Sequence, residues 1–173
     1  MKKALMVFLF SVMLAISANA SEDPYVYEEY AGVQAAFPKE WSTSQSEDGT
    51  TTWYYPGYVY VNDDTIGHIM VQRPKDEVPE QSKELFLFYY KNDLLETTHF
   101  NSISHFDVSG VECERAGFTQ TYDGKEYEGE MVIIVNNGSA IVISYMEQPD
   151  ADTDLKDDFE KIISSISLTS GEK

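Results

Sequence analysis

The clearest alternation of apolar and polar positions runs through residues 112–147. Two dipeptides that favour two-residue hairpin turns, Asp123-Gly124 and Asn137-Gly138, interrupt it. They predict three consecutive antiparallel strands, whose register follows by counting outward from each turn. One face of these strands is expected to carry Ala116, Phe118, Tyr127, Met131, Ile133, Val142 and Met146. The other face is expected to carry Cys113, Val132, Ile134, Ile141 and Ile143. Strands that are apolar on both faces are typical of a sheet covered on both sides.

Towards the first turn, the second face becomes polar. Glu126, Glu128 and Glu130 alternate along one strand, and like charges at this spacing repel unless they are solvated or paired. In the predicted register, Arg115 lies diagonally from Glu130 and Tyr145 lies opposite Glu130. Two interpretations stay open. The stripe is a solvated sheet end with one ion pair, or it lines a polar pocket for a cation or cationic ligand, with Arg115, Glu128, Glu130 and Tyr145 as candidate ligand-binding residues.

A first helix is predicted over residues 79–98. Its expected core face carries Leu85, Phe86, Phe88, Tyr89 and Leu95. A second apolar patch on the opposite side consists of Leu87, Tyr90 and Leu94. Either this patch is a surface for a protein partner, or residues 100–110 or the N-terminal strands cover it.

A second helix is predicted over residues 154–164. Its apolar positions form one stripe of Leu155, Phe159, Ile162, Ile163 and Ile166. Asp152, Thr153 or Asp154 is expected to cap its first turn. Shorter segments rich in aromatic and β-branched residues predict strands over 30–37, 51–55, 58–62 and 66–73. The expected fold class is therefore α+β, with a mainly antiparallel β-sheet flanked by helices in α/β/α layers.

The first twenty residues have the pattern of a secretory signal peptide. Lys2 and Lys3 precede an apolar run over 4–16, and Ala18-Asn19-Ala20 matches a signal peptidase site. We expect cleavage after Ala20, export to the periplasm or the medium, and one domain over 21–173. No second apolar run of membrane-spanning length follows, so no membrane insertion is expected after cleavage.

The chain is strongly acidic, with 30 acidic and 12 basic residues and a formal charge of −18. Loss of Lys2 and Lys3 with the leader would change this charge from −18 to −20. Such a charge repels nucleic acid and anionic lipid, so neither is expected as a partner. A solubility surface, a cationic ligand or a basic protein partner remains compatible with it.

Candidate catalytic and metal-binding motifs are weak. Cys113 is the only cysteine, which excludes an intramolecular disulfide, and we expect it to be buried and unreactive. The three histidines follow no metal-ligand spacing. Asp150-x-Asp152-x-Asp154 is similar to a calcium loop but has Leu155 and Lys161 where that loop needs glycine and glutamate. No catalytic residue, metal site or cofactor is therefore expected.

Two segments resemble exported proteins of the PsbP-like and DcrB-like group. Residues 32–41, GVQAAFPKEW, are similar to its opening strand with an aromatic-Pro-x-x-Trp signature, and residues 159–166, FEKIISSI, to its closing helix. The resemblance implies the fold shared by PsbP, Mog-type Ran-binding proteins and DcrB. It also implies an assembly or accessory role without catalysis. No metal ligand of the photosynthetic members can be placed on a residue here, and the lipobox of many bacterial members is missing.

These observations favour an exported, soluble, non-catalytic protein that binds an unidentified ligand or partner. The alternative is a secreted enzyme, such as a hydrolase that uses carboxylates. That alternative requires two acidic side chains to converge in a cleft with pKa values driven apart.

Overall fold

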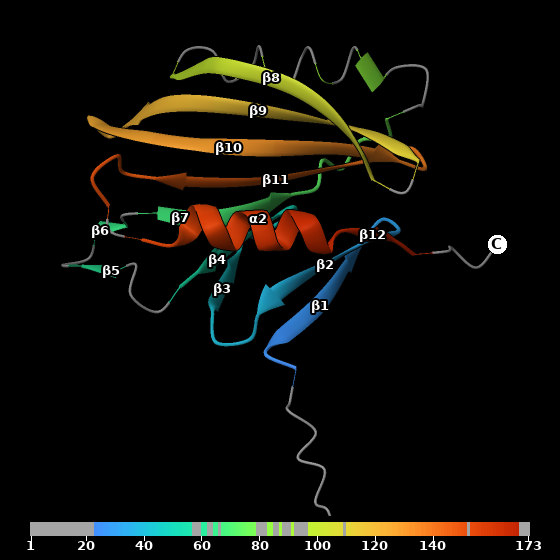
Figure 1. Ribbon diagram of the computed structural model, residues 1–173, viewed down its shortest axis with the longest axis horizontal. Coiled ribbons are helices and arrows are strands. Elements are labelled where there is room, and N and C mark those ends of the chain that lie inside the picture. Colours follow the sequence, from blue (N-terminus) through green and yellow to red (C-terminus); the bar gives the residue numbers. More distant parts are fainter. Residues whose placement is uncertain are drawn as a thin grey trace, which may run out of the picture.

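The computed structural model describes residues 23–56, 60–61, 64–65, 67–78, 83–84, 87, 91, 97–108, 110–151 and 153–169 (Figure 1). The predicted leader and its cleavage site lie outside these residues, as do Tyr90 and Leu94. Within the described part of the chain, no helix is long and apolar enough to cross a membrane.

An antiparallel seven-stranded sheet is the largest element, with the strand order β3-β4-β7-β11-β10-β9-β8. Its strands are β3 (Ser42–Gln45), β4 (Thr51–Tyr55), β7 (Gly67–Gln72), β8 (Thr98–Val108), β9 (Val111–Tyr122), β10 (Lys125–Asn136) and β11 (Ser139–Glu147). A second sheet has the order β1-β2-β12, formed by β1 (Tyr25–Tyr30), β2 (Val33–Pro38) and β12 (Ser167–Leu168). A separate two-stranded ribbon pairs β5 (Tyr60–Val61) with β6 (Asp64–Thr65).

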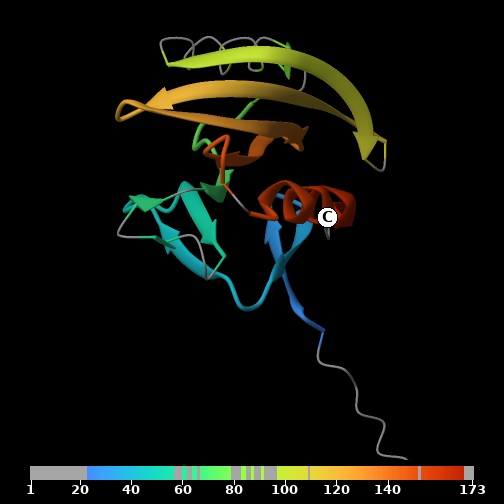
Figure 2. The same ribbon diagram turned by 60° about the vertical axis from the view of Figure 1, so that its left-hand side comes forward.

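Helix α2 (Leu155–Ser165) lies beside the small sheet and on one side of the large one (Figures 1 and 2). The Ser165 hydroxyl accepts a hydrogen bond from the Ala36 amide at 2.9 Å, which joins α2 to β2. The helix follows the prediction closely and buries Leu155, Phe159, Ile162 and Ile163. Asp154 stands at its N-cap without a side-chain cap, while the Leu155 amide donates to Thr153 Oγ1 at 3.3 Å.

The predicted register of β9, β10 and β11 is confirmed. Met131 pairs with Ala116, Ile134 with Cys113, and Glu130 with Tyr145. Both hairpin turns have two residues with positive φ, near +50° and +75°, a conformation that Asp-Gly and Asn-Gly tolerate best. Because side chains alternate along a strand, this register decides which residues face each side of the sheet.

The two sides of the large sheet have separate apolar cores. Val132, Ile134, Ile141 and Ile143 pack with α2 and β2 on one side. The buried cluster on the other side consists of Leu87, Ala116, Phe118, Met131, Ile133 and Val142. Cys113 is fully buried in the first core, and this burial raises the pKa of its thiol to about 11. Its burial is thus as predicted, and its low reactivity stays a prediction.

Two expectations about elements need correction. The segment 30–37 is not one strand, because Ala31 and Gly32 have positive φ and turn the chain between β1 and β2. Residues 98–108 form the edge strand β8. The helix predicted over 79–98 therefore ends before Thr98. Within that segment Lys83, Glu84, Leu87 and Lys91 are helical.

The expectation of a sheet flanked by helices is overstated. On one side of the large sheet, the covering layer combines α2 with the small sheet. Leu87 also departs from its expected place on a partner surface. Its side chain is only 6% exposed and belongs to the second core. The apolar neighbours of Leu87 come from β9, β10 and β11, so this residue contacts the sheet.

Candidate functional site

Arg115 is the centre of an ion-pair network on the α2 side of the large sheet. Its Nε donates to Glu130 Oε2 at 2.6 Å, and its Nη1 donates to Glu160 Oε2 at 3.1 Å. Lys156 Nζ lies 3.4 Å from the second oxygen of Glu130. The Arg115 guanidinium also lies 5.8 Å from the centre of the Phe159 ring. The network therefore joins β9 and β10 to α2.

The two carboxylates favour the charged form of the guanidinium. The hydrogen bonds that Arg115 donates to Glu160 and Glu130 raise the pKa of Arg115 above its ordinary value, and Arg115 in turn lowers the pKa of Glu160. Tyr145 is buried opposite Glu130, with its ring centre 5.0 Å from that of Phe159. Burial raises the pKa of Tyr145, and the neighbouring Glu130 adds to this rise.

Among the four candidate ligand-binding residues, the structure brings Arg115, Glu130 and Tyr145 together. The fourth, Glu128, is exposed and lies directly opposite Glu147 on β11. The protein's own Arg115 and Lys156 already neutralise Glu130, which agrees with the interpretation of this stripe as a paired, solvated sheet end. Over the described residues, no three His, Cys, Asp or Glu side chains are arranged to hold a metal ion.

Glu128 and Glu147 lie directly opposite each other, and they are the acid pair that best meets the requirement of the alternative hydrolase. Burial raises the pKa of Glu147, and the charge of Glu128 contributes to the rise. The Thr153 hydroxyl donates a hydrogen bond to Glu147. Neither carboxylate lines the aromatic cavity described next. The aromatic cavity therefore offers this pair no substrate cleft.

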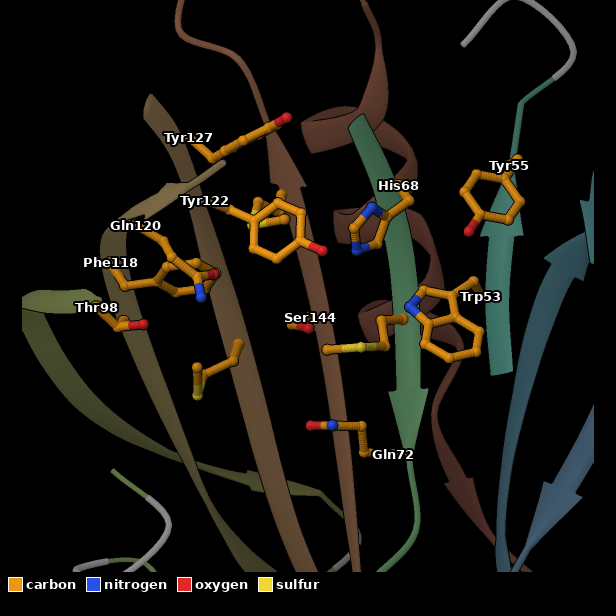
Figure 3. A pocket seen from close by; sticks show the side chains of 13 residues that line it. Trp53, Tyr55, His68, Gln72, Thr98, Phe118, Gln120, Tyr122, Tyr127 and Ser144 are labelled. Atoms are coloured by element: carbon orange, nitrogen blue, oxygen red, sulfur yellow. The ribbon is translucent and has the colours of Figure 1, made fainter. Parts of the chain in front are cut away.

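A cavity of about 380 Å³ lies on the opposite face of the large sheet (Figure 3). Six rings contribute to its wall: Trp53, Tyr55, His68, Phe118, Tyr122 and Tyr127. Three thioethers line it as well, from Met70, Met131 and Met146. The polar lining residues are Gln72, Thr98, Gln120 and Ser144. None of the described residues that line the cavity is an Asp, Glu, Lys or Arg.

The pairing of the strands explains why these side chains converge. Trp53 lies opposite Met70, Met70 opposite Ser144, and Ser144 opposite Met131. These pairs form one row across β4, β7, β11 and β10, and directly opposed residues point to the same face. In the next row, His68 lies opposite Met146. Most of the side chains in these rows are methionines or aromatic rings. They leave a hollow whose apolar wall can adapt to a ligand, because methionine side chains are flexible.

His68 adds a neutral polar ring to the cavity. Burial lowers its pKa to about 4, so the imidazole is uncharged at neutral pH. Its ring stands edge-on to Tyr55, with 6.0 Å between the ring centres. A neutral imidazole donates one hydrogen bond and accepts another, which suits it to an uncharged ligand.

Thr98 carries the clearest unsatisfied polar group at this site. The residue is 3% exposed, and its Oγ1 is buried without a hydrogen-bond partner in the described part of the chain. Figure 3 shows the hydroxyl pointing into the cavity. A buried unpaired hydroxyl costs about 1–3 kcal/mol, a cost that a ligand with a hydrogen-bonding atom would remove.

A second, more polar cavity of about 320 Å³ adjoins the aromatic one. Thr98, Gln120 and Tyr127 line both cavities. Around the second cavity stand Thr97, His99, Thr119, Thr121, Glu126 and Pro149. Glu126, the first member of the predicted acidic stripe, lines this second cavity, and its side chain shares the face of Glu128 and Glu130, opposite to the aromatic cavity.

The aromatic cavity was missed by sequence reasoning. The register did place Phe118, Tyr127, Met131 and Met146 on one face, but these residues were expected to be filled core. The sequence signal was the chemistry of that face. It is rich in methionine and aromatic residues, whereas the opposite face of the same strands carries isoleucine and valine.

Comparison by sequence assigns no family, because no family profile and no curated protein matches the chain. Comparison by structure finds the same fold in three proteins at low identity. Cyanobacterial PsbP from Synechocystis sp. PCC 6803 has a TM-score of 0.60 at 12% identity, over 90% of this chain and 98% of that one. LpqN, involved in cell envelope biogenesis of Mycobacterium tuberculosis, has 0.56 at 14%, over 86% and 87%. The Saccharomyces cerevisiae Ran-binding protein Mog1p has 0.51 at 12%, over 83% and 95%.

A structure from Bacteroides thetaiotaomicron is also similar, with a TM-score of 0.53 at 13% identity over 87% of this chain. This chain spans half the length of that one. At such identities the comparisons establish the fold alone. The chain has the fold of PsbP and Mog1p, as its aromatic-Pro-x-x-Trp segment implied. Phe37 of that segment is fully buried and stacks on Tyr54, with 4.0 Å between ring centres, and Trp41 is buried nearby.

Proposed function

We propose that this PsbP-type fold serves as an exported accessory protein without catalytic activity, and that the aromatic cavity is its ligand site. The observation that carries the proposal is the cavity itself. A hollow of 380 Å³ has the size of small-molecule sites, and a mainly apolar wall with few polar groups is their usual chemistry. The lining predicts that the part of the ligand held there is uncharged and contains a ring.

The accessory role is supported by the fold and by the resemblance of the two terminal segments. The cell-envelope process named for LpqN agrees with export, as does the signal-peptide pattern before Ser21. The carboxylate hydrolase remains the rival proposal. The arrangement of Glu128 and Glu147 favours it less, because the described cavity is on the other face of the sheet.

Binding of an uncharged aromatic probe tests the ligand site. N-phenyl-1-naphthylamine is neutral at pH 7 and fluoresces strongly in apolar cavities. We expect saturable binding to the mature protein, and at least about fivefold weaker binding to Ser144→Phe, because the added ring fills the hollow. Ser144 is buried and lies on the cavity wall.

Thr43→Phe is the matched control. Thr43 is exposed on β3, and its cross-strand partner is Tyr54 rather than the cavity residue Trp53. It should bind the probe as the unmodified protein does. Equal binding by both variants, with the fold intact by circular dichroism, would remove the cavity as the site. N-terminal sequencing of exported protein tests the export proposal and should begin at Ser21.

A further inference from the structure

Cross-strand pairing places a polar row beside an aromatic row in the wall of the aromatic cavity. In the polar row, Thr98 lies opposite Gln120, and Gln120 lies opposite Tyr127. The adjacent row consists of Phe118, Gly129, Met146 and His68. Directly opposed residues point to the same face of a sheet, so both rows face the cavity.

Gly129 leaves the middle of the aromatic row without a side chain of its own. A Cβ at this position would lie 3.0 Å from Phe118 Cζ, so the tip of the Phe118 ring occupies the room that a larger residue would need. The row therefore presents the Phe118 ring, a thioether and the neutral imidazole. An aromatic ligand ring can pack against such a surface.

Two side chains of the polar row offer complementary hydrogen-bonding groups. Thr98 Oγ1 is buried without a partner in the described part of the chain, and Figure 3 shows it pointing into the cavity. Gln120 Nε2 donates to Thr97 Oγ1 at 3.4 Å, which leaves the side-chain carbonyl oxygen of Gln120 as an acceptor. A ligand hydroxyl can accept from Thr98 and donate to Gln120 at the same time, whereas an ether oxygen can only accept.

The surroundings of these groups favour a neutral ligand. The described residues that line the cavity include no Asp, Glu, Lys or Arg, so none of them could neutralise an ionised ligand. Burial of an unpaired charge costs much more than burial of a hydrogen-bonded hydroxyl. The formal charge of −18 on the whole chain also repels anions before any contact is made.

We propose that the aromatic cavity takes a neutral phenol, whose ring packs against the aromatic row and whose hydroxyl bonds Thr98 and Gln120. This inference rests on the proposed function of the cavity and adds the chemical class and the orientation of its ligand. Thr98 is then the residue that distinguishes a phenol from a plain aromatic hydrocarbon, because its hydroxyl gains a partner when the phenol binds.

Four naphthalenes that differ in one substituent test this proposal. They are 2-naphthol, 2-methoxynaphthalene, naphthalene and 2-naphthoate. Equilibrium dialysis at pH 7 should show 2-naphthol binding about three- to tenfold more tightly than naphthalene, from the added hydrogen bonds. The methyl ether should fall between them, because it cannot donate to Gln120, and the carboxylate of 2-naphthoate should make it the weakest ligand.

Thr98→Val removes the hydroxyl with little change of shape. It should weaken binding of 2-naphthol at least about threefold and leave binding of naphthalene unchanged. Because the lost hydroxyl has no partner in the free protein, the midpoint of thermal unfolding should rise by about 2–4 °C. A residue whose hydroxyl served the fold would instead lower that midpoint when replaced.

Thr52→Val is the matched control. Thr52 is also 3% exposed, but it lies opposite Val71 of the first core, and its hydroxyl accepts a hydrogen bond from Gln45 Nε2 at 3.4 Å. This variant should not raise the midpoint of unfolding and should preserve the ranking of the four ligands.

The possible failures separate the inference from the proposed function. Equal binding of 2-naphthol and naphthalene, or of 2-naphthol and its methyl ether, would overturn the assignment of a phenol while the ligand site stands. A folded Thr98→Val variant that keeps the full preference for 2-naphthol, or that is less stable than the unmodified protein, would overturn it as well. Failure of all four naphthalenes and of the naphthylamine probe would overturn the proposed function itself.

Discussion

The two faces of the large sheet are built from the same strands but differ in chemistry. On the α2 side, β10 and β11 contribute Val132, Ile134, Ile141 and Ile143, each at most 1% exposed. On the cavity side, the same strands contribute Tyr127, Met131, Ser144 and Met146. Branched aliphatic side chains have few rotamers and pack densely, whereas methionine and aromatic side chains leave and adapt to irregular space. The closed face thus supplies stability and the cavity face supplies a candidate binding surface.

The comparison also separates two uses of charge. On the α2 side, Arg115 and Lys156 pair with carboxylates and connect the sheet to the helix. Nearer the turn between β9 and β10 on the same face, Glu126 forms no ion pair among the described residues. Glutamates of one strand can therefore either form structural ion pairs or stay free to bind a ligand. The side chains that neighbouring elements place beside each glutamate decide between the two. The following predictions test the two faces against each other.

Truncation on the closed face should have the largest effect. Ile143→Ala removes buried methyl groups from a site enclosed by β7, β10 and α2. We expect a loss of about 2–5 kcal/mol in the free energy of unfolding, from lost apolar burial and a residual cavity. Chemical denaturation measures it. A loss below about 1 kcal/mol would show that the closed face is not densely packed.

Removal of the central cation should rank next. Arg115→Met keeps much of the apolar contact with Phe159 but leaves Glu130 and Glu160 without their main donor. We expect a loss of about 1–2 kcal/mol at pH 7 by denaturant titration. Lys156→Met is the control, because the Lys156 side chain is 60% exposed and should contribute only a few tenths of a kcal/mol.

The effect of Arg115→Met should depend on pH. Ion pairing lowers the folded-state pKa of Glu160 below its ordinary value of 4.5. The pair therefore stabilises the protein above about that pH, and its contribution is lost as the pH falls further. The two stability curves should converge in acid. A constant gap down to pH 3 would mean that packing, rather than charge, causes the loss.

Truncation on the cavity face should cost less than its counterpart on the closed face. Met146→Ala, three residues after Ile143 on the same strand, enlarges a hollow that already exists. Because its side chain is only partly buried, we expect a loss of about 1 kcal/mol in the free energy of unfolding. A loss equal to that of Ile143→Ala would end the distinction between the two faces.

The smallest expected effect is a gain in stability. Glu128→Gln removes a like charge directly opposite Glu147 and should stabilise the protein by about 0.2–0.5 kcal/mol at pH 7. Because the folded-state pKa of Glu147 is raised, ionisation of this carboxyl disfavours folding. The gain should therefore disappear below the pH at which Glu147 is protonated. Glu29→Gln, opposite the neutral Gln34, should show no gain in the same thermal unfolding series.

Elements with strong local signals could be predicted from the sequence. Asp123-Gly124 and Asn137-Gly138 determine two turns, and their register places Arg115 diagonally from Glu130 as observed. The stripe of α2 was equally clear. Strand β8 was missed because its middle is polar and exposed, and because its pairing with β9 includes an irregularity between Phe100 and Ser102. The turn at Ala31-Gly32 was missed because alanine rarely adopts positive φ.

The candidate site could be predicted only in part. The sequence placed four of the cavity residues on one face, but their partners Trp53 and His68 come from β4 and β7, whose place in the sheet depends on long-range pairing. The expected partner surface met the same limit. The helical pattern separated Leu87 from the predicted core stripe, and only packing showed that the sheet contacts Leu87.

By itself, the sequence determined the hairpins, their register, the amphipathic helix α2, the acidic charge and the alternation that separates two faces of the sheet. These are properties of neighbouring residues and of residues joined by short turns, for which the local conformational preference is strong. The tertiary structure alone decided which face is filled and which is hollow, which glutamates meet a cation, and that the Thr98 hydroxyl has no hydrogen-bond partner among the described residues. These outcomes depend on the volumes and charges that distant segments bring together, and no local pattern contains that sum.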